Sequence, residues 1–216
     1  MKFSKEFKQA ISHLPYKEKD KLLFRLLKKD SILIKRLEYE LIDERTLEDR
    51  RDQMEEFVIE QVDVMTNNFH SPGYLNMDIR FLSGYITEHV KVTKDKFGEV
   101  SLNLLMLNRV LEKNNDNLMK KTPEKNKKLG IAILTRAFKI MILINKLHED
   151  LFIELEDDLK RLGQLILQND HLMKLAIHHG FDVKWLIQAN IPEDIAAIQK
   201  DLKDRGYLTT KVRRMF

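Results

Sequence analysis

Two pairs of carboxylates have a spacing that suits metal binding on a helix. Glu60 and Asp63 form one pair, and Glu154 and Asp157 form the other. Side chains three residues apart project from one helix face, and carboxylate oxygens are ligands that Mg²⁺ accepts. The spacing is also common in acidic helices, and both pairs fall opposite the apolar face of their segment. We therefore interpret them as solvated acidic faces, with a metal site as the alternative.

Three of the seven histidines lie between residues 171 and 179. His178 and His179 precede Gly180, and this order is typical of a helix C-terminus. Basic groups there stabilise the helix dipole, and glycine readily adopts the left-handed conformation. The chain has no H-E-x-x-H motif, no G-x-S-x-G motif and no glycine-rich phosphate loop. We therefore predict helix capping for these histidines, and we predict no catalytic residue and no cofactor.

The segment from residue 175 to residue 187 is similar to a helix-turn-helix. Ala176 supplies the small residue of the first helix, Gly180 supplies the turn, and an apolar position follows six residues later. In such motifs the second helix enters the DNA major groove with polar residues exposed. Lys184 and Gln188 are the candidates for reading bases. Trp185 suits a core better, so a helical hairpin that closes the fold is the favoured interpretation.

Two basic clusters are candidates for binding phosphate backbones without sequence preference. No aromatic residues alternate with the first cluster, so base stacking is not indicated. A solubilising loop is the simpler interpretation of that cluster. The clusters comprise Lys120, Lys121, Lys125, Lys127 and Lys128, and Lys211, Arg213 and Arg214 in the C-terminal tail.

The composition is that of a helical protein of the cytoplasm. Folding a chain of 216 residues buries roughly 70% of its extended surface, which is enough for a self-sufficient core. The absence of cysteine fits a reducing compartment. The N-terminus lacks the apolar run of a signal peptide, and the most apolar segment is interrupted by Arg136 and Lys139, so we expect no membrane span.

Charge changes sign from block to block along the chain. Residues 1–30 carry nine basic and four acidic side chains, a net charge of +5, whereas residues 31–66 carry five basic and eleven acidic, a net charge of −6. Residues 118–148 have a net charge of +7 and residues 149–170 one of −5. Such blocks either neutralise one another in the fold or present separate surfaces to partners.

Apolar residues recur at helical spacing along nearly the whole chain. Residues 129–147 are apolar around most of the circumference, which predicts a central helix buried by several neighbours. The segment 114–127 is rich in Asn and Lys, which predicts an exposed loop. The helices expected span about residues 4–14, 15–29, 31–43, 46–69, 74–95, 98–114, 129–147, 150–168, 171–179, 182–190 and 192–206.

The sequence predicts one all-α domain over residues 1–216, with about ten helices in antiparallel hairpins. The arrangement is an irregular multi-helix bundle or a short α-superhelical array, and residues 171–216 are a possible helical subdomain. The leading functional hypothesis is a non-enzymatic interaction or scaffold protein that binds another protein through charged helical faces. The alternative is a nucleic-acid-binding protein that uses the helix-turn-helix-like segment and the basic tail. A third hypothesis, a metal-dependent nucleotide pyrophosphohydrolase, follows from the similarity of the carboxylate spacing to that of the all-α enzymes of this class.

Overall fold

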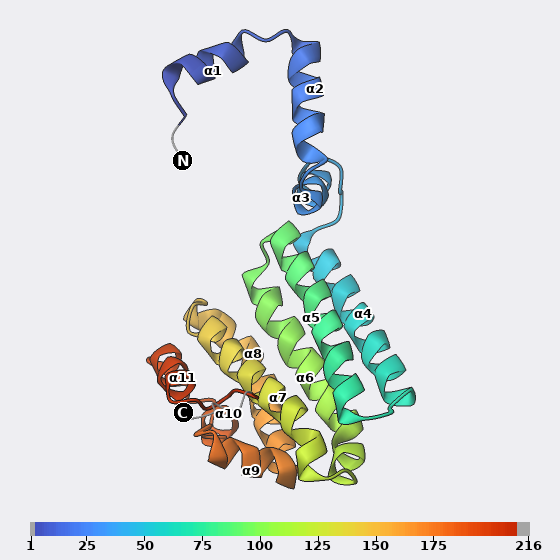
Figure 1. The fold of residues 1–216 in the computed structure, drawn as a ribbon, viewed down its shortest axis with the longest axis vertical. Helices are drawn as coiled ribbons and strands as arrows, with labels where there is room; N and C mark the ends of the chain where they lie inside the picture. Colours follow the sequence, from blue (N-terminus) through green and yellow to red (C-terminus); the bar gives the residue numbers. More distant parts are fainter. Residues whose placement is uncertain (1–2, 211–216) are drawn as a thin grey trace, which may run out of the picture.

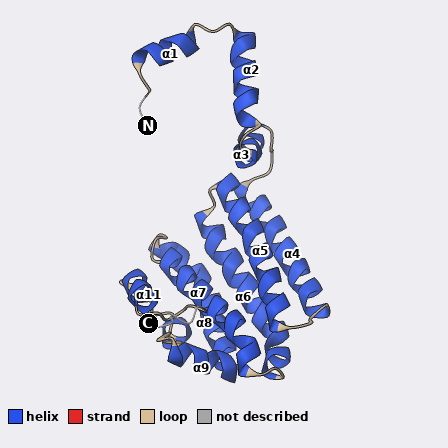
Figure 2. Ribbon diagram, in the orientation of Figure 1, coloured by secondary structure: helices blue, strands red, loops and turns tan. Residues whose placement is uncertain are grey.

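The computed structural model describes residues 3–210, which form eleven α-helices and no β-strand (Figures 1 and 2). The fold class predicted from the sequence is thus confirmed. The helices are α1 (Lys5–Ser12), α2 (Tyr16–Leu27), α3 (Ser31–Leu41), α4 (Leu47–Asn67), α5 (Pro72–Thr93), α6 (Lys96–Met119), α7 (Pro123–Ile144), α8 (Glu149–Leu167), α9 (Asp170–His178), α10 (Lys184–Ile187) and α11 (Ile195–Asp204).

Most helices pack best against the next helix but one, so the body has two layers. One layer contains α3, α5 and α7 in that order, and the other contains α4, α6, α8 and α10. Consecutive helices from α4 to α7 run in opposite directions and are joined by short connections (Figure 1). This pattern is typical of a short array in which helical hairpins stack side by side.

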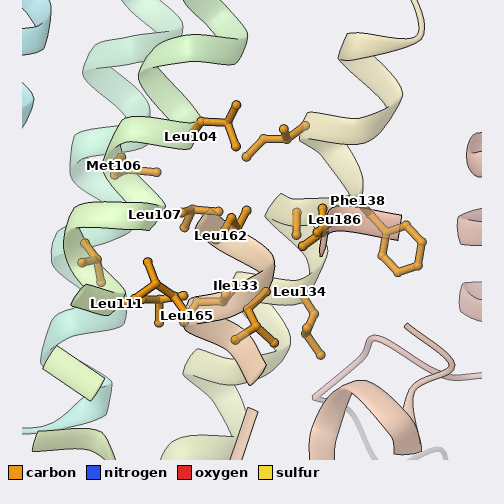
Figure 3. Packing of buried hydrophobic residues seen from close by; sticks show 14 of the residues in the cluster. Leu104, Met106, Leu107, Leu111, Ile133, Leu134, Phe138, Leu162, Leu165 and Leu186 are labelled. Carbon is orange, nitrogen blue, oxygen red and sulfur yellow. The ribbon is translucent and has the colours of Figure 1, made fainter. Parts of the chain in front are cut away.

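The core is centred on two helices, α6 and α7, and the sequence analysis placed only α7 at the centre. Thirteen residues of α6 are buried, against eleven of α7. Leucines of α6 meet side chains of α7 and α8 in one apolar cluster (Figure 3). The helix α6 was underestimated because four of its buried residues are asparagines, which lower its apparent hydrophobicity. These are Asn103, Asn108, Asn114 and Asn115.

The prediction of a loop at 114–127 was wrong, because three of its asparagines are buried and hydrogen-bonded. Asn114 Nδ2 donates to Thr66 Oγ1 of α4 at 3.0 Å, and Asn115 Nδ2 donates to the Leu165 carbonyl of α8 at 2.9 Å. A third asparagine, Asn126, donates to the Leu118 carbonyl at the end of α6. Paired buried amides fix the helices around them, so α6 continues to Met119 and only a short turn precedes α7.

A single carboxylate joins α4, α5 and α6. Asp95 follows the end of α5, its Oδ1 accepts from the Gly98 N–H at the start of α6, and Arg51 of α4 donates to both carboxylate oxygens at 2.7 and 3.1 Å. Burial raises the pKa of Asp95, but His89, Arg51 and the Gly98 N–H outweigh burial and hold the pKa well below its usual range. Asp95 therefore stays ionised and paired at neutral pH.

The apolar helix α7 begins earlier than predicted, at Pro123, and ends at Ile144. Its polar wedge faces solvent, as shown by Lys139, whose side chain is 49% exposed and lies 2.7 Å from the Glu99 carboxylate. The remaining circumference packs against α5, α6, α9 and α11. The helix α7 is therefore a core helix with one solvated edge, as expected for a segment that is apolar around most of its circumference.

Two helical glycines provide a matched test of the packing. A Cβ at Gly163 of α8 would lie 2.9 Å from the backbone nitrogen of Ile187, whereas a Cβ at Gly84 of α5 would meet nothing within 4 Å. We expect Gly163→Ala to lower the free energy of unfolding by about 1–3 kcal/mol through overpacking. Gly84→Ala should raise it by about 0.4–1 kcal/mol, because alanine loses less backbone entropy on folding. Urea unfolding followed by circular dichroism measures both, and equal effects would contradict the close approach of α8 and α10.

Candidate protein-interaction site

Residues 3–42 form an N-terminal arm that contributes nothing to the core. No residue in this range is buried, although it contains three helices. Only α3 packs closely on the body, against α5, while α2 touches α3 lightly. Figure 1 shows α1 and α2 extending away from the body. The arm is thus attached at its base and exposed over most of its length.

Local signals, rather than burial, define the helices of the arm. The Ser4 hydroxyl accepts from the Phe7 N–H at the start of α1, and the Asp30 carboxylate accepts from the Leu33 N–H at the start of α3. Pro15 precedes α2 and suits its first turn. Helices of eight to twelve residues are marginal in water by themselves. A surface that covers the arm would stabilise them.

The arm exposes large apolar side chains at helical spacing. Phe24 is 61% exposed and Leu26 is 53% exposed, and both belong to α2. Lysines and Arg25 separate these residues, which makes the arm both apolar and basic. Contiguous exposed apolar surface on a soluble protein marks an interaction site. The large exposed apolar residues of the arm are Phe3, Phe7, Ile11, Tyr16, Leu23, Phe24, Leu26, Leu33, Leu41 and Ile42.

An open cavity of about 900 Å³ lies at the base of the arm, between α3, α5 and the start of α4. Five of its charged side chains pair with one another. Asp43 lies 2.7 Å from Arg45 and 3.2 Å from Arg50, and Lys35 of α3 pairs with Glu88 of α5. The hydrogen bond from Arg45 is the main cause that lowers the pKa of Asp43 to about 2. The Lys35–Glu88 pair joins the arm to the body, and the Asp43 pairs fix the segment that follows the arm. We assign the cavity to this attachment.

A second exposed apolar surface lies on the body, in a groove of about 310 Å³ between α4 and α5. We call it the α4–α5 groove. Phe81 of α5 is 66% exposed there, and Tyr85 packs edge-on against Phe57 of α4 with ring centroids 5.2 Å apart. The lining residues are Gln61, Val64, Met65, Asn68, His70, Tyr74, Asp78, Phe81, Leu82 and Tyr85. The groove could receive an amphipathic helix.

The carboxylate pairs proposed as metal ligands lie on two helices. Glu60 and Asp63 are on α4, where Asp63 pairs with Lys113 of α6. Glu154 and Asp157 are exposed on α8. Among the described residues, no group of three or more His, Asp or Glu side chains is arranged to hold a metal ion. The metal site stays a prediction that this geometry does not favour.

The lysines proposed to bind nucleic acid surround the connection between α6 and α7. Lys120 and Lys121 lie in the turn, and Lys121 Nζ lies 6.0 Å above the Phe69 ring. Lys125, Lys127 and Lys128 are exposed in the first turns of α7. The remaining candidates, Lys211, Arg213 and Arg214, lie outside the described residues.

The segment similar to a helix-turn-helix comprises α9, a turn and α10, which has only four residues. Lys184 and Gln188 are exposed, as the sequence analysis proposed. The neighbouring Leu186 is buried, and α10 packs against α8 at the point where Gly163 leaves no room for a side chain. A recognition helix of one turn that packs on the body can present few side chains to the major groove of DNA. Nucleic-acid binding therefore stays an untested prediction.

The C-terminal helices pack on the layers of the body, α9 and α11 against α7 and α10 against α8. The predicted end of α9 is confirmed, since its C-cap is His179 and Gly180 has a φ of +68°. His179 is buried, and its Nδ1 accepts from the Leu208 N–H at 3.2 Å. The sequence analysis did not foresee this bond, which holds residue 208 to α9, because residues 29 apart gave no local signal.

Comparisons of the chain with protein-family models, curated proteins and solved structures found no match. Among the described residues, no helix is long and apolar enough to cross a membrane. Function is therefore inferred from the chain's own surfaces, of which the arm and the α4–α5 groove are the most distinctive.

The stability of the protein should depend on pH through His179. Burial, followed by the charges of His178 and Lys127, lowers the pKa of His179 below its usual value near 6.5. The unfolded chain therefore binds a proton before the folded chain does, so the free energy of unfolding falls as pH drops below about 6.5. Melting temperatures measured from pH 7.5 to pH 5.5 should decline, and His179→Gln should reduce the decline. His13→Gln, at an exposed position of the arm, is the control; an unchanged slope in H179Q would contradict this assignment.

Proposed function

We propose that this chain is an interaction protein that binds another protein through its N-terminal arm. The observation that supports the proposal most directly is the complete lack of buried residues in a helical segment of about 40 residues. Ordering a backbone costs roughly 1–2 kcal/mol per residue, and the body contributes little contact to offset that cost for α1 and α2. A protein partner that covers their apolar faces would supply the missing stabilisation.

The chemistry of the arm indicates the kind of surface that it would bind. Burying a Leu or Phe side chain contributes roughly 1.5–3 kcal/mol, so a few of the exposed apolar residues suffice for specific binding. Residues 1–30 have a net charge of +5. The expected partner surface is thus an apolar groove bordered by carboxylates, in the helix-in-groove mode of recognition.

Binding is a better proposal than catalysis for the cavity at the base of the arm. Asp43, Arg45 and Arg50 pair within it, and the Lys35–Glu88 pair already serves to attach the arm. The absence of cysteine supports the cytoplasm as the proposed compartment. Nucleic-acid binding and metal-dependent nucleotide hydrolysis stay as alternatives from the sequence, and no additional contact favours them.

Two exposed leucines of α2 test the proposal. Partners enriched on the immobilised full chain are identified, purified and titrated by calorimetry. We expect the double variant Leu23→Glu, Leu26→Glu to weaken binding at least about 30-fold, because each charge is placed in an apolar contact worth roughly 2 kcal/mol or more.

The control for this titration is Ile153→Glu, which changes an apolar residue of α8 that is 72% exposed. It should alter the dissociation constant less than threefold. Equal affinity of the wild-type chain and the arm variant for every purified partner would contradict the proposal.

A further inference from the structure

We infer that the arm binds a second copy of this chain, with α2 of each copy seated in the α4–α5 groove of the other. This inference rests on the proposed function, since it names the partner of the arm. It is derived from the packing order of the body, from the dimensions of the two surfaces and from their charges.

The packing order of the body leaves one helix position unoccupied. Each of α3, α4, α5 and α6 packs against the helix two places further along the chain. By the same rule α2 would lie beside α4, yet α2 makes no comparable contact with α4 and extends away from the body (Figure 1). The α4–α5 groove lies at this end of the array. A helix seated in the groove would therefore continue the array by one member.

The groove and α2 match in length and in chemical character. Exposed apolar residues of α5 recur at helical spacing at Tyr74, Met77, Phe81 and Tyr85. They span eleven steps, or about 17 Å of helix at 1.5 Å per residue, and the twelve residues of α2 span about 18 Å. Such a match allows the apolar side chains of α2 to meet the row along its whole length.

The carboxylate that lines the groove is opposite in charge to the basic side chains of α2. Asp78 of α5 lines the groove, and it is the one carboxylate among the lining residues. The arm supplies the positive charge, with Lys17, Lys21 and Arg25 on α2. Oppositely charged surfaces favour encounter and suppress wrong partners. The basic block found in the sequence would thus face a groove that carries one carboxylate, Asp78.

Exchange of arms closes the assembly. Each copy offers one arm and one groove, so two copies related by a two-fold axis satisfy both and leave neither exposed. The connection between α2 and α3, residues 28–30, sets the direction of α1 and α2 relative to the body. A monomer would leave an apolar basic arm and an apolar groove in water.

The mass of the full chain in solution is the first test. Sedimentation equilibrium at concentrations from 5 to about 500 µM should give twice the chain mass of 25.7 kDa at the upper end. Raising the salt concentration from about 50 to 500 mM should weaken the dimer several-fold, because the charges at the edge of the interface are screened. A monomer throughout the concentration range would overturn the inference.

Variants of exposed residues then locate the interface without disturbing the core. The arm variant Leu23→Glu, Leu26→Glu and the groove variant Tyr74→Glu, Phe81→Glu should each raise the dimer dissociation constant at least about 30-fold. Ile153→Glu should leave it within threefold. An equimolar mixture of the arm and groove variants should restore a dimer, since it contains one intact arm and one intact groove. A dimer that persists in either variant alone, or a mixture that stays monomeric, would overturn the inference.

The lack of cysteine permits a direct measurement of where the arm binds. A donor dye at Asp20→Cys on one population and an acceptor dye at Asn68→Cys on another should show energy transfer on mixing. Transfer in a chain that carries both dyes, diluted into excess unlabelled chain, would place the arm in its own groove and overturn the inference. So would a monomer whose arm instead binds vesicles containing anionic phospholipid.

The two levels of the proposal fail separately. If the chain stays monomeric but the arm variant loses a purified heterologous partner, arm exchange is wrong and the proposed function stands. If the arm variant changes neither self-association nor any other binding, both are wrong.

Discussion

The arrangement of the body depends on one buried ion pair, between Asp95 and Arg51. The carboxylate lies where α5 gives way to α6, so its bonds set the angle of that turn and fix α4 beside it. The backbone on both sides of Asp95 has the conformation and the space that this carboxylate requires. Lys94 adopts the left-handed conformation, with a φ of 63°, and Gly98 is a glycine where a Cβ would lie 2.2 Å from the carboxylate. The spacing of α4 and α5, and hence the α4–α5 groove, follows from this junction.

Removing the charged groups of a buried ion pair from water costs free energy. Such a pair often serves to favour one packing arrangement of the helices over others. Here the apolar contacts between α4, α5 and α6 come from interchangeable Leu, Ile, Val and Met side chains, which would tolerate some sliding of one helix along another. The Asp95–Arg51 pair and the buried asparagines have fixed partners, so sliding of one helix along another would break their hydrogen bonds. Polar groups thus determine the register of a core that apolar groups stabilise.

Much of the fold could be predicted from hydrophobic periodicity and capping residues. The helix expected at 46–69 occupies Leu47–Asn67, and the Thr46 hydroxyl caps it by accepting from the Asp49 N–H. The failures occurred where local and tertiary signals disagree. Asn114, Asn115 and Asn126 resemble loop residues in the sequence, yet tertiary hydrogen bonds keep them inside or next to helices. The importance of α6 was missed for the same reason.

The candidate site could be predicted only in part. The basic charge of the N-terminal segment and the acidic charge of α4 are visible in the sequence, but not which blocks stay exposed. An apolar stripe on α2 has the same spacing whether it is buried or not, and only the tertiary contacts show that the body leaves it uncovered. The placement of the arm follows from the contact of α3 with α5 and from the Lys35–Glu88 pair, which join residues far apart in sequence.

An arm without buried residues also has an evolutionary consequence. Substitutions in α1 and α2 leave the core of the body untouched, so selection for a stable fold does not restrict their sequence. Selection that keeps the apolar spacing and the basic charge of α1 and α2 must therefore act through binding. The arm can therefore diverge in specificity while the body stays constant, and the conservation of its exposed face among related chains would measure directly how strongly a partner constrains it.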